Sequence, residues 1–262
     1  MCSSDLGLRV LDIGCGWGGL ACYIARTTGA QVTGITLSPE QWKYAREHAK
    51  REGLASQVRF LLSDYREVKG SYDRIVSVGM FEHVGVGNFA AFFERLRGLL
   101  NQEGVALLHS IGRAGGPSYT DPWIHKYIFP GGYIPALSEV LPHAEGNGFH
   151  VTDVEILRSH YARTLREWSD RFERNREAAR ELYGEEFCRM WELYLLLSEA
   201  SFEHLGNMVF QLQLATRPNL VPVTRDYLLA PPAFASASRE RRSARSASAR
   251  RRRAAISAVS VS

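Results

Sequence analysis

One glycine-rich segment near the N-terminus constrains the fold of this chain more than any other feature. Residues 12–19 read Asp-Ile-Gly-Cys-Gly-Trp-Gly-Gly and lie at the end of the apolar run Leu8–Ile13. This run is typical of a buried strand, and Gly19–Thr28 is typical of a helix. Glycines between them allow a tight turn and let a ligand approach the backbone closely. The segment therefore predicts a nucleotide-binding strand–turn–helix unit.

Strand and helix signals alternate along the rest of the chain. Such alternation is typical of an α/β protein with a parallel sheet covered by helices on both faces. We therefore expect a Rossmann-like fold with a mostly parallel seven-stranded sheet. The further predicted strands are Gln31–Ile35, Val58–Leu62, Arg74–Val78, Val105–Ser110, Val151–Leu157 and Asn207–Thr216. The predicted helices include Gly19–Thr28, with Leu20, Tyr23 and Ile24 on one face, Phe89–Leu100 and a helix near Ile134–Gly148. A further predicted helix runs from Pro39 to about Glu52, because Ser38 is a typical N-cap and the proline follows it at the first helical position.

The remaining segments suggest one domain with a tail. Arg113–Gly132 is rich in glycine, proline and aromatic residues and is expected to form a long ordered loop. Tyr161–Leu205 is helical but too long for one crossover, so we expect a cap inserted before the last strand. Residues 231–262 are rich in alanine, serine and arginine, a composition typical of disorder. The predicted organisation is one domain over 1–230, with the cap at about 161–205, followed by the tail.

The basic charge of the chain is concentrated in that tail. Arg239–Arg253 carry eight arginines and one glutamate, a net charge of +7 within a total of +4, so the remainder is near −3. Such a run is attracted to an anionic membrane surface, binds nucleic acid without specificity, or is a solvated extension without function. No specific nucleic-acid partner is therefore expected.

The sequence offers no sign of a membrane span, a secretory signal or a metal site. No window contains the roughly 18 apolar residues that a span requires. Met1–Leu8 lacks a basic region followed by an apolar run. We expect a cytoplasmic protein with free thiols, because no cysteine has the spacing of a metal ligand. The cysteines are Cys2, Cys15, Cys22 and Cys188.

Two nucleotide cofactors compete for the glycine segment. A dinucleotide requires an acidic residue about 20 positions further on, at the end of the second strand. That place reads Gly-Ile-Thr-Leu-Ser over Gly34–Ser38, without an acid. Asp12 instead precedes the glycines, and an acid there suits a cationic cofactor with an amino-acid end. We therefore expect S-adenosylmethionine, with a glycine turn that binds no ligand as the remaining alternative. The residues expected to hold it in this segment are Asp12, Gly14, Gly16 and Gly18.

Five ordered segments resemble the cyclopropane-fatty-acyl-phospholipid synthases and the related mycolic acid cyclopropane synthases. These are class I S-adenosylmethionine-dependent methyltransferases, so the resemblance implies that fold. The likeness runs from Leu8 to about Tyr227. The segments are Val10–Ala21, Gly34–Ser38, Asp73–Gly85, Leu107–Gly112 and Lys126–Gly132.

The resemblance also implies an activity and a set of site residues. In this family a methyl group moves to the cis double bond of an acyl chain in phospholipid. A carbocation forms, a proton leaves, and a cyclopropane ring closes, with bound bicarbonate as the base. The residues that match the bicarbonate contacts are Glu82, His109, the backbone of Ile111, and Tyr161. Those that match further cofactor contacts are Thr36, Leu37 and Gln41, with Asp64 and Tyr65 where the adenine would lie.

These residue types fit the chemistry, although each has a plainer interpretation. An alkene is a poor nucleophile, so it requires a dry site, and a carbocation requires aromatic faces nearby. The plainer interpretations are an exposed strand-end acid for Glu82, a core histidine for His109 and a core tyrosine for Tyr161. Trp123 and Phe129 would then be loop packing. The aromatic candidates are Trp123, Tyr127, Phe129 and Tyr133.

Departures from the family leave other functions open. Relatives carry a region with a Tyr-Ser-Cys segment before the first strand, whereas the predicted first strand here begins near residue 8, as in a truncated member. A cysteine in the C-terminal helices of some relatives falls at Ser198.

Three hypotheses therefore stand side by side. The first is cyclopropanation of unsaturated phospholipid acyl chains by a peripheral protein, monomeric or homodimeric, at the inner membrane surface. The second is methylation of another acceptor, because plant benzylisoquinoline N-methyltransferases share the Phe-Glu-His stretch, or methyl branching of an acyl chain. The third is a non-catalytic protein that binds the cofactor or lipid.

Overall fold

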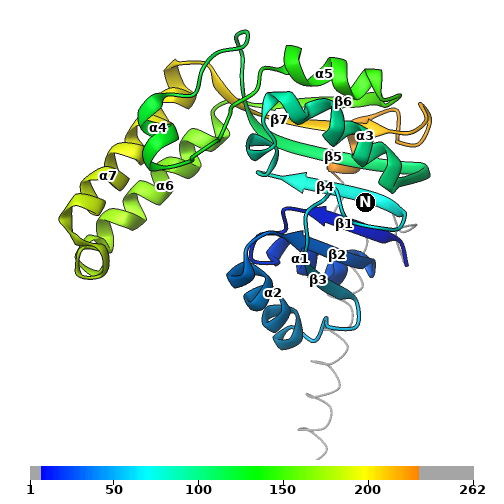
Figure 1. Ribbon diagram of the computed structural model, residues 1–262, viewed down its shortest axis with the longest axis horizontal. Helices are drawn as coiled ribbons and strands as arrows, with labels where there is room; N and C mark the ends of the chain where they lie inside the picture. The colour runs from blue at the N-terminus through cyan, green and yellow to red at the C-terminus, as the bar shows by residue number, and fades with distance from the viewer. Residues whose placement is uncertain (1–6, 230–262) are drawn as a thin grey trace, which may run out of the picture.

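A twisted sheet of seven strands organises the molecule, in the order β3-β2-β1-β4-β5-β7-β6 (Figure 1). The computed structural model describes residues 7–229. Neighbouring strands from β3 to β5 pair in parallel, and β7 runs antiparallel between β5 and β6. The predicted α/β fold with a mostly parallel sheet is confirmed. The strands are β1 (Arg9–Ile13), β2 (Gln31–Thr36), β3 (Val58–Leu62), β4 (Tyr72–Val78), β5 (Leu100–Arg113), β6 (His150–Leu157) and β7 (Asn207–Ala215).

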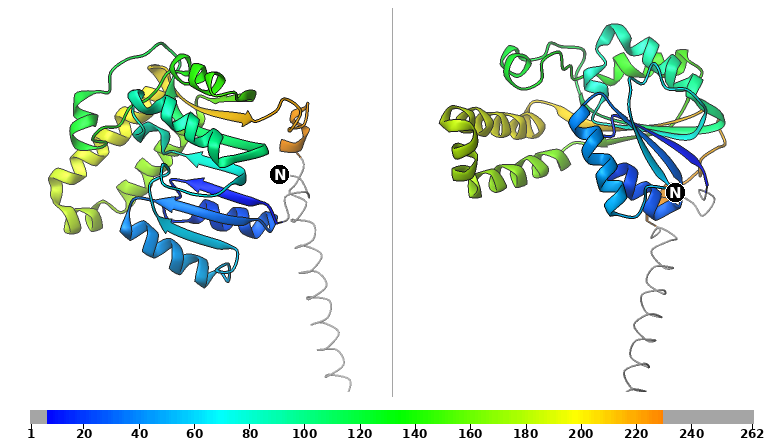
Figure 2. Two further views of the ribbon diagram at one scale, coloured as in Figure 1. Left: turned by 45° about the vertical axis from the view of Figure 1, so that its right-hand side comes forward. Right: turned by 60° about the horizontal axis from the view of Figure 1, so that its bottom comes forward.

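Helices cover both faces of the sheet, as the two views of Figure 2 show. One face packs small and aliphatic side chains of α1 and α2 against β1, β2 and β3. The other face packs α3 and α5 against β4, β5 and β7. The helices are α1 (Gly19–Thr28), α2 (Pro39–Arg51), α3 (Phe89–Leu99), α4 (Pro122–Tyr127), α5 (Leu137–Gly146), α6 (His160–Arg174) and α7 (Arg176–His204), with the short 3-10 turns η2 (Phe81–His83), η3 (Val86–Asn88) and η4 (Arg225–Leu228).

Two local expectations were wrong. The buried face of α1 carries Ala21, Ile24 and Ala25, whereas Leu20 and Tyr23 are exposed. Small residues let this helix approach the sheet closely, so the contact face lies one position further along. Arg113–Gly132 is not entirely a loop, because it contains α4. Asp121 caps this helix by accepting a hydrogen bond from the Trp123 amide at 2.9 Å. The following proline stands at the first helical position, a pair that could have been recognised in the sequence.

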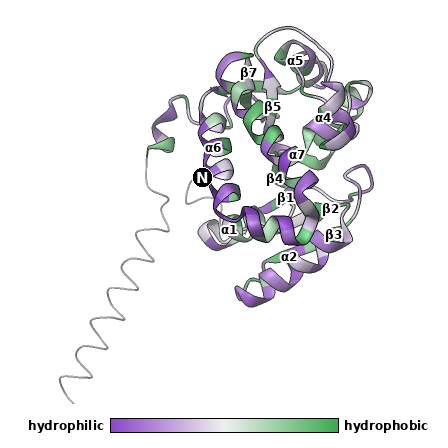
Figure 3. Ribbon diagram, turned by 90° about the vertical axis from the view of Figure 1, so that its left-hand side faces the viewer, coloured by the Kyte–Doolittle hydropathy of each residue, from purple (hydrophilic) through white to green (hydrophobic). Residues whose placement is uncertain are grey.

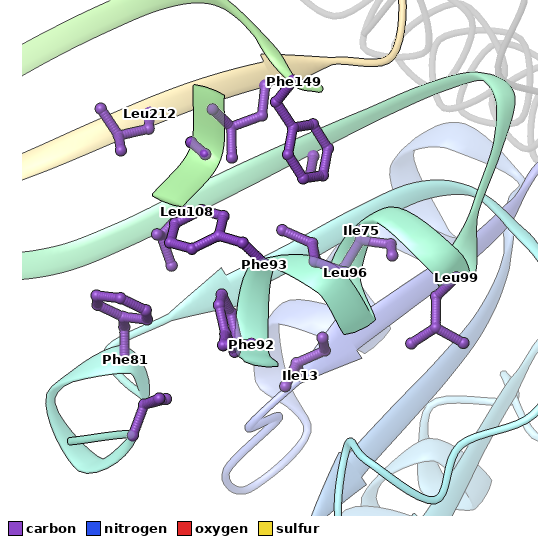
Figure 4. Close-up of a cluster of buried hydrophobic side chains, with 14 of the residues drawn as sticks. Ile13, Ile75, Phe81, Phe92, Phe93, Leu96, Leu99, Leu108, Phe149 and Leu212 are labelled. Atoms are coloured by element: carbon purple, nitrogen blue, oxygen red, sulfur yellow. The ribbon is translucent and has the colours of Figure 1, made fainter. Parts of the chain in front are cut away.

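The larger core cluster supports the turn that follows β4. Phe81 is fully buried and stacks on Phe89 with ring centroids 4.5 Å apart. It also meets the edge of Phe92 at 5.0 Å, and Figure 4 shows these rings beside the aliphatic side chains of the sheet. Aromatic pairs of this kind contribute stability beyond the area that they bury. The turn η2 is therefore held in place by its first residue, and this fixes where its second residue, Glu82, can lie.

The helices α6 and α7 form an arm that projects from one end of the sheet (Figure 1), and Figure 3 views the molecule from the side of this arm. They precede β7, as expected for a helical insertion before the last strand. Leu165, Leu195 and Phe202 are buried between the two helices and the sheet. Arg166 pairs with Glu203 at 2.9 Å and with Glu199 across the two helices. The arm is therefore attached through its base, close to the ends of β5 and β7.

The described residues, 7–229, also bear on membrane spans, metal sites and thiols. Within this range no helix is both long and apolar enough to cross a bilayer. Over the same residues, no three His, Cys, Asp or Glu side chains gather as they would around a metal ion. Cys15, Cys22 and Cys188 are buried thiols. The predictions for Cys2 and the arginine-rich tail fall outside the described residues.

Candidate active site

The expected site residues come from loops at one edge of the sheet. Carboxyl ends of parallel strands share an edge, and ligands of open α/β sheets bind beyond it. Residues expected from the sequence follow or end β1, β2, β3, β4 and β5 at that edge. They are Asp12, Gly14, Gly16, Gly18, Thr36, Leu37, Asp64, Tyr65, Glu82, His109 and Ile111. Gln41 joins them from the first turn of α2, and Tyr161 from the start of α6.

The three glycines of the first loop have different surroundings. All have positive φ angles, 81° at Gly14, 54° at Gly16 and 83° at Gly18. A Cβ at Gly14 would lie 2.7 Å from Met80, and one at Gly18 would lie 2.7 Å from Phe60. A Cβ at Gly16 would have no atom within 4 Å. Gly16 therefore faces open space, while a side chain at Gly14 would meet Met80 and one at Gly18 would meet Phe60.

Asp12 is a buried acid with one carboxylate oxygen that lacks a partner among the described residues. Its residue is 1% exposed, and its Oδ2 atom accepts no hydrogen bond from any described residue. Burial raises the pKa of Asp12 to about 7. A buried carboxylate normally has a hydrogen-bond donor or a cation beside it, because burial without one is costly. The side chain is thus suited to a cationic ligand held at the carboxyl end of β1.

The end of β2 and the start of α2 form a closed hydrogen-bond network. The Thr36 hydroxyl donates to the Gln41 Oε1 atom at 2.7 Å, and the Ser38 amide donates to Thr36 Oγ1 at 3.1 Å. The backbone amide of Gln41 in turn donates to Ser38 Oγ at 3.2 Å, which confirms the predicted helix cap. Since the Gln41 oxygen is engaged, its NH2 group remains the donor for a ligand hydroxyl. Leu37, between them, is 71% exposed at the open edge.

Asp64 and Tyr65, in the loop after β3, are both held by neighbouring side chains. Arg66 donates to both carboxylate oxygens of Asp64, at 2.9 and 2.6 Å, and lowers the pKa of that acid. Tyr65 meets Phe92 edge-on with ring centroids 5.4 Å apart, and burial raises its pKa. Asp64 can therefore accept from a ligand only by sharing its carboxylate with Arg66. Tyr65 is a rigid wall rather than a mobile side chain.

Glu82 forms the centre of a second group of residues. Its Oε1 atom accepts a hydrogen bond of 2.6 Å from the Ile111 amide. Its Oε2 atom is buried and has no partner among the described residues. Burial raises the pKa of Glu82, although the bond from Ile111 opposes this shift. The interpretation of Glu82 as an exposed strand-end acid is therefore wrong. The Ile111 amide, expected to face an anion, is instead bonded to this carboxylate.

His109 and Tyr161 come from different elements, β5 and α6. His109 lies two residues before Ile111 in β5, so their side chains share a face of the sheet. Burial lowers the pKa of His109, which favours the neutral ring. The pKa of Tyr161 is raised by burial and further by the negative charge of Glu82. The arm therefore brings the tyrosine hydroxyl within electrostatic range of Glu82, while its ring packs on Phe202 at 5.0 Å.

The aromatic residues of the loop before α5 mostly secure it. The Tyr133 amide donates to the Glu82 carbonyl at 2.8 Å, and its hydroxyl donates to Glu139 at 2.7 Å. Phe129 lies between His83 and Tyr194, at centroid distances of 6.1 and 6.0 Å. Trp123 and Tyr127 contact one another at 5.9 Å. Tyr133 therefore anchors the turn that carries Glu82, and Phe129 joins that turn to the arm.

Two residues of this region were missed in the sequence. Gln211 of β7 lies beside His109, with its Nε2 atom 3.3 Å from the histidine Nδ1 atom. Tyr194 of α7 adjoins Tyr161. Burial raises the pKa of Tyr194, and its electrostatic interaction with Tyr161 raises it further. Gln211 and Gln213 alternate with apolar residues in the predicted last strand, so a polar face was recognisable. Their partners across the sheet were not.

The fold and the site define a class of protein. The sheet order with one antiparallel strand, the glycine loop after β1 and the acid that precedes it are those of a Rossmann-like methyltransferase. Residues 3–212 match the family model described as mycolic acid cyclopropane synthetase. The chain belongs to this family.

Known relatives agree with this assignment. The chain is 43% identical over 207 residues to a probable fatty acid methyltransferase of Pseudomonas putida, covering 76% of this chain and 52% of that protein. It is 43% identical over 196 residues to the cyclopropane-fatty-acyl-phospholipid synthase of Escherichia coli K12, covering 75% and 50%. The crystal structure of mycolic acid cyclopropane synthase CmaA1 complexed with SAH and CTAB has a TM-score of 0.75 and 32% identity, covering 80% and 79%. The chain spans about half the length of the first two relatives.

Proposed function

We propose that this chain transfers a one-carbon unit from S-adenosylmethionine to the cis double bond of an unsaturated phospholipid acyl chain and forms a cyclopropane ring. The observation that carries this proposal is the pair of buried, unpartnered carboxylate oxygens at the edge of the sheet, Asp12 Oδ2 and Glu82 Oε2. One acid suits a cationic cofactor, and the other suits a small polar group beside the acceptor. The relatives named as cyclopropane synthases support the same reaction.

The residues of the first loop fit S-adenosylmethionine. The open space at Gly16 admits the cofactor to the backbone, and Asp12 supplies a negative charge for its amino-acid end. The side-chain NH2 group of Gln41 can donate to a ribose hydroxyl. Leu37 and Tyr65 offer apolar surfaces for an adenine. The relative CmaA1 was crystallised with SAH. When bound, the cofactor supplies an activated methyl group.

The second group of residues would hold bicarbonate as the base. A raised pKa favours a protonated Glu82, which can donate a hydrogen bond to an anion instead of repelling it. A neutral His109 and the Tyr161 hydroxyl add two further donors. The anion would accept the proton released from the transferred carbon. Phe129, Tyr161 and Tyr194 offer aromatic faces where positive charge develops on the acyl chain.

Other reactions would use the same groups of residues. Methyl branching of an unsaturated acyl chain differs only in where the proton is lost, and the Pseudomonas putida relative is named a fatty acid methyltransferase. Binding of the cofactor or lipid without turnover is a further alternative. We place the reaction at the inner surface of the membrane, where the substrate lipid lies, with the protein peripheral to the bilayer.

The test is incubation of the full chain with S-adenosylmethionine, bicarbonate and vesicles of a cis-monounsaturated phospholipid. We expect acyl chains to gain one CH2 in mass and to resist ozonolysis, whereas vesicles of a saturated phospholipid stay unchanged. A gain that ozonolysis cleaves would indicate methyl branching. Turnover with small amines alone, or vesicle binding without turnover, would contradict the proposal.

A further inference from the structure

Gln211 and His109 face each other across two antiparallel strands. They are direct partners in the register of β5 and β7. Their side chains meet, with the Gln211 Nε2 atom 3.3 Å from the His109 Nδ1 atom. The glutamine therefore contacts the Nδ1 side of the histidine ring and leaves the Nε2 atom free of this contact. The contact therefore constrains the ring without occupying the atom that a ligand would need.

An amide nitrogen is only a donor, so this contact selects one form of the imidazole. If Nδ1 accepts a hydrogen bond, it carries no proton, and a neutral ring must carry its proton on Nε2. Burial lowers the pKa of His109 and so favours the neutral ring that this argument requires. The partner of one ring nitrogen commonly determines what the other can do.

We propose that Gln211 is a positioning residue that holds His109 as the Nε2–H tautomer, so that the histidine donates a hydrogen bond to the oxyanion beside Glu82. This inference rests on the proposed function for the identity of the anion, but the tautomer can be measured without turnover. Gln211 acts through His109, the residue that its side chain contacts.

The neighbouring Gln213 provides a matched control. It lies two residues along β7 on the same face of the sheet, yet its side chain contacts Thr152 at 3.0 Å and Tyr227 at 3.4 Å instead of a histidine. Across the described part of the chain, the Gln211 side chain has His109 as its hydrogen-bond partner. A change that removes an amide from this face can thus be made with and without loss of the histidine contact.

The tautomer is read by nitrogen-15 NMR of the full chain labelled at histidine, with His109→Ala to assign the signals. We expect a protonated Nε2 and an unprotonated Nδ1 in the wild type and in Gln213→Met. Gln211→Met should give a mixture of tautomers. Gln211→Glu, which can only accept, should move a proton to Nδ1. An Nδ1–H ring in the wild type, or an unchanged ring in Gln211→Glu, would overturn the inference.

The kinetic readout uses S-adenosylmethionine, bicarbonate and vesicles of a cis-monounsaturated phospholipid. We expect Gln211→Met to lower kcat by about 10- to 100-fold, the usual range for a residue that orients another, with KM for S-adenosylmethionine unchanged. Gln213→Met should keep the wild-type kcat. Equal losses in both variants would refute positioning and leave only packing. A wild type with the expected tautomer but no turnover would contradict the proposed function instead.

Discussion

At the scale of single residues, two acids at the edge of the sheet each have a buried carboxylate oxygen without a partner among the described residues. Glu82 has one backbone donor, from Ile111, and one unpartnered oxygen. Asp12 has an unpartnered oxygen and a pKa raised to about 7 by burial. A buried charge without a partner is unfavourable, and such groups concentrate where a ligand will supply the partner. Each of these oxygens is therefore expected to lower the stability of the unliganded protein and to gain a partner when a ligand binds.

The pH dependence of stability should report Asp12. Its pKa is about 7 in the folded protein and near 3.8 in the unfolded chain, so between these values the folded protein holds a proton that the unfolded chain releases. The free energy of unfolding therefore falls as pH rises through this window, by on the order of 4 kcal/mol at most. Asp12→Asn should lack this component while losing cofactor affinity. Urea unfolding of both proteins at pH 5 and pH 8 checks this, and a pH-independent difference between them would contradict it.

Substitutions at Glu82 and His109 should affect turnover rather than cofactor binding. Both are proposed to hold the base, so Glu82→Gln and His109→Ala are expected to lower kcat about 100-fold or more. The dissociation constant for S-adenosylmethionine, measured by calorimetry, should remain near the wild-type value. Near-normal rates in both variants would show that neither residue supports an anion in this site.

A side chain at Gly16 should block the cofactor. The site of its Cβ is open space, so Gly16→Val would fill the approach to the backbone. Gly53 is the matched control, with a φ of 70° and no atom within 4 Å of a Cβ. Calorimetry should show loss of S-adenosylmethionine binding in Gly16→Val and retention in Gly53→Val. Equal affinities in the two variants would remove the loop from the cofactor site.

At the scale of elements, short turns between strands and helices hold the site residues. Two contacts hold the turn η2. Phe81 stacks on Phe89 in the core, and the Tyr133 backbone amide donates to the Glu82 carbonyl. The turn before α2 is fixed by Ser38, which caps the helix and links Thr36 to Gln41. The turn η2 is therefore held by contacts from other segments, and the turn before α2 by hydrogen bonds within its own segment.

The cap at Ser38 should have a measurable contribution. Ser38→Ala removes the acceptor for the Gln41 amide and should lower the free energy of unfolding by about 1 kcal/mol. Ser38→Thr keeps the acceptor and also the hydroxyl that donates to Glu40 at 2.9 Å, and should preserve most of the stability. Urea unfolding curves of the two variants compare them directly. If alanine and threonine destabilise the protein equally, the capping bond does not stabilise α2.

At the scale of the whole molecule, the arm completes the site. The sheet alone presents Glu82, Ile111 and His109, and α6 adds Tyr161 from the far side. Phe129 and Tyr194 connect the loop before α5 to α7. A tilt of the arm would therefore move the tyrosine hydroxyl relative to Glu82 without disturbing the cofactor loop. This would separate the residues proposed to bind the cofactor from those proposed to surround the acceptor.

The arginine-rich tail, beyond the described residues, is expected to add affinity for anionic membranes. Arg239–Arg253 carry a net charge of +7. Each basic residue near such a surface contributes about 1 kcal/mol at best, and salt weakens the attraction. The full chain should co-sediment with anionic vesicles at low salt more strongly than a chain ending at Pro231, and equally weakly with neutral vesicles. Unchanged binding after truncation would mean that the tail is not an anchor.

Local sequence patterns determined the framework of this protein. Periodicity located every strand of the sheet, the Ser38-Pro39 pair located the start of α2, and the glycines after β1 located the first loop. These features depend on turns, caps and alternation within a few residues, so they can be read without knowing what packs against them. Asp12 was recognisable for the same reason, because it stands at the start of the glycine segment, whereas Glu82 and His109 came from the resemblance to a known family.

Only the tertiary structure decided which side chains meet. Packing requires a glycine at position 18, because Phe60, from another strand, occupies the place that its Cβ would take. The order of the last two strands places Gln211 against His109, and the arm places Tyr161 near Glu82. These contacts join residues far apart in the chain, and their geometry follows from how whole elements pack. No local pattern specifies such packing, because it is the sum of many weak contacts across the core.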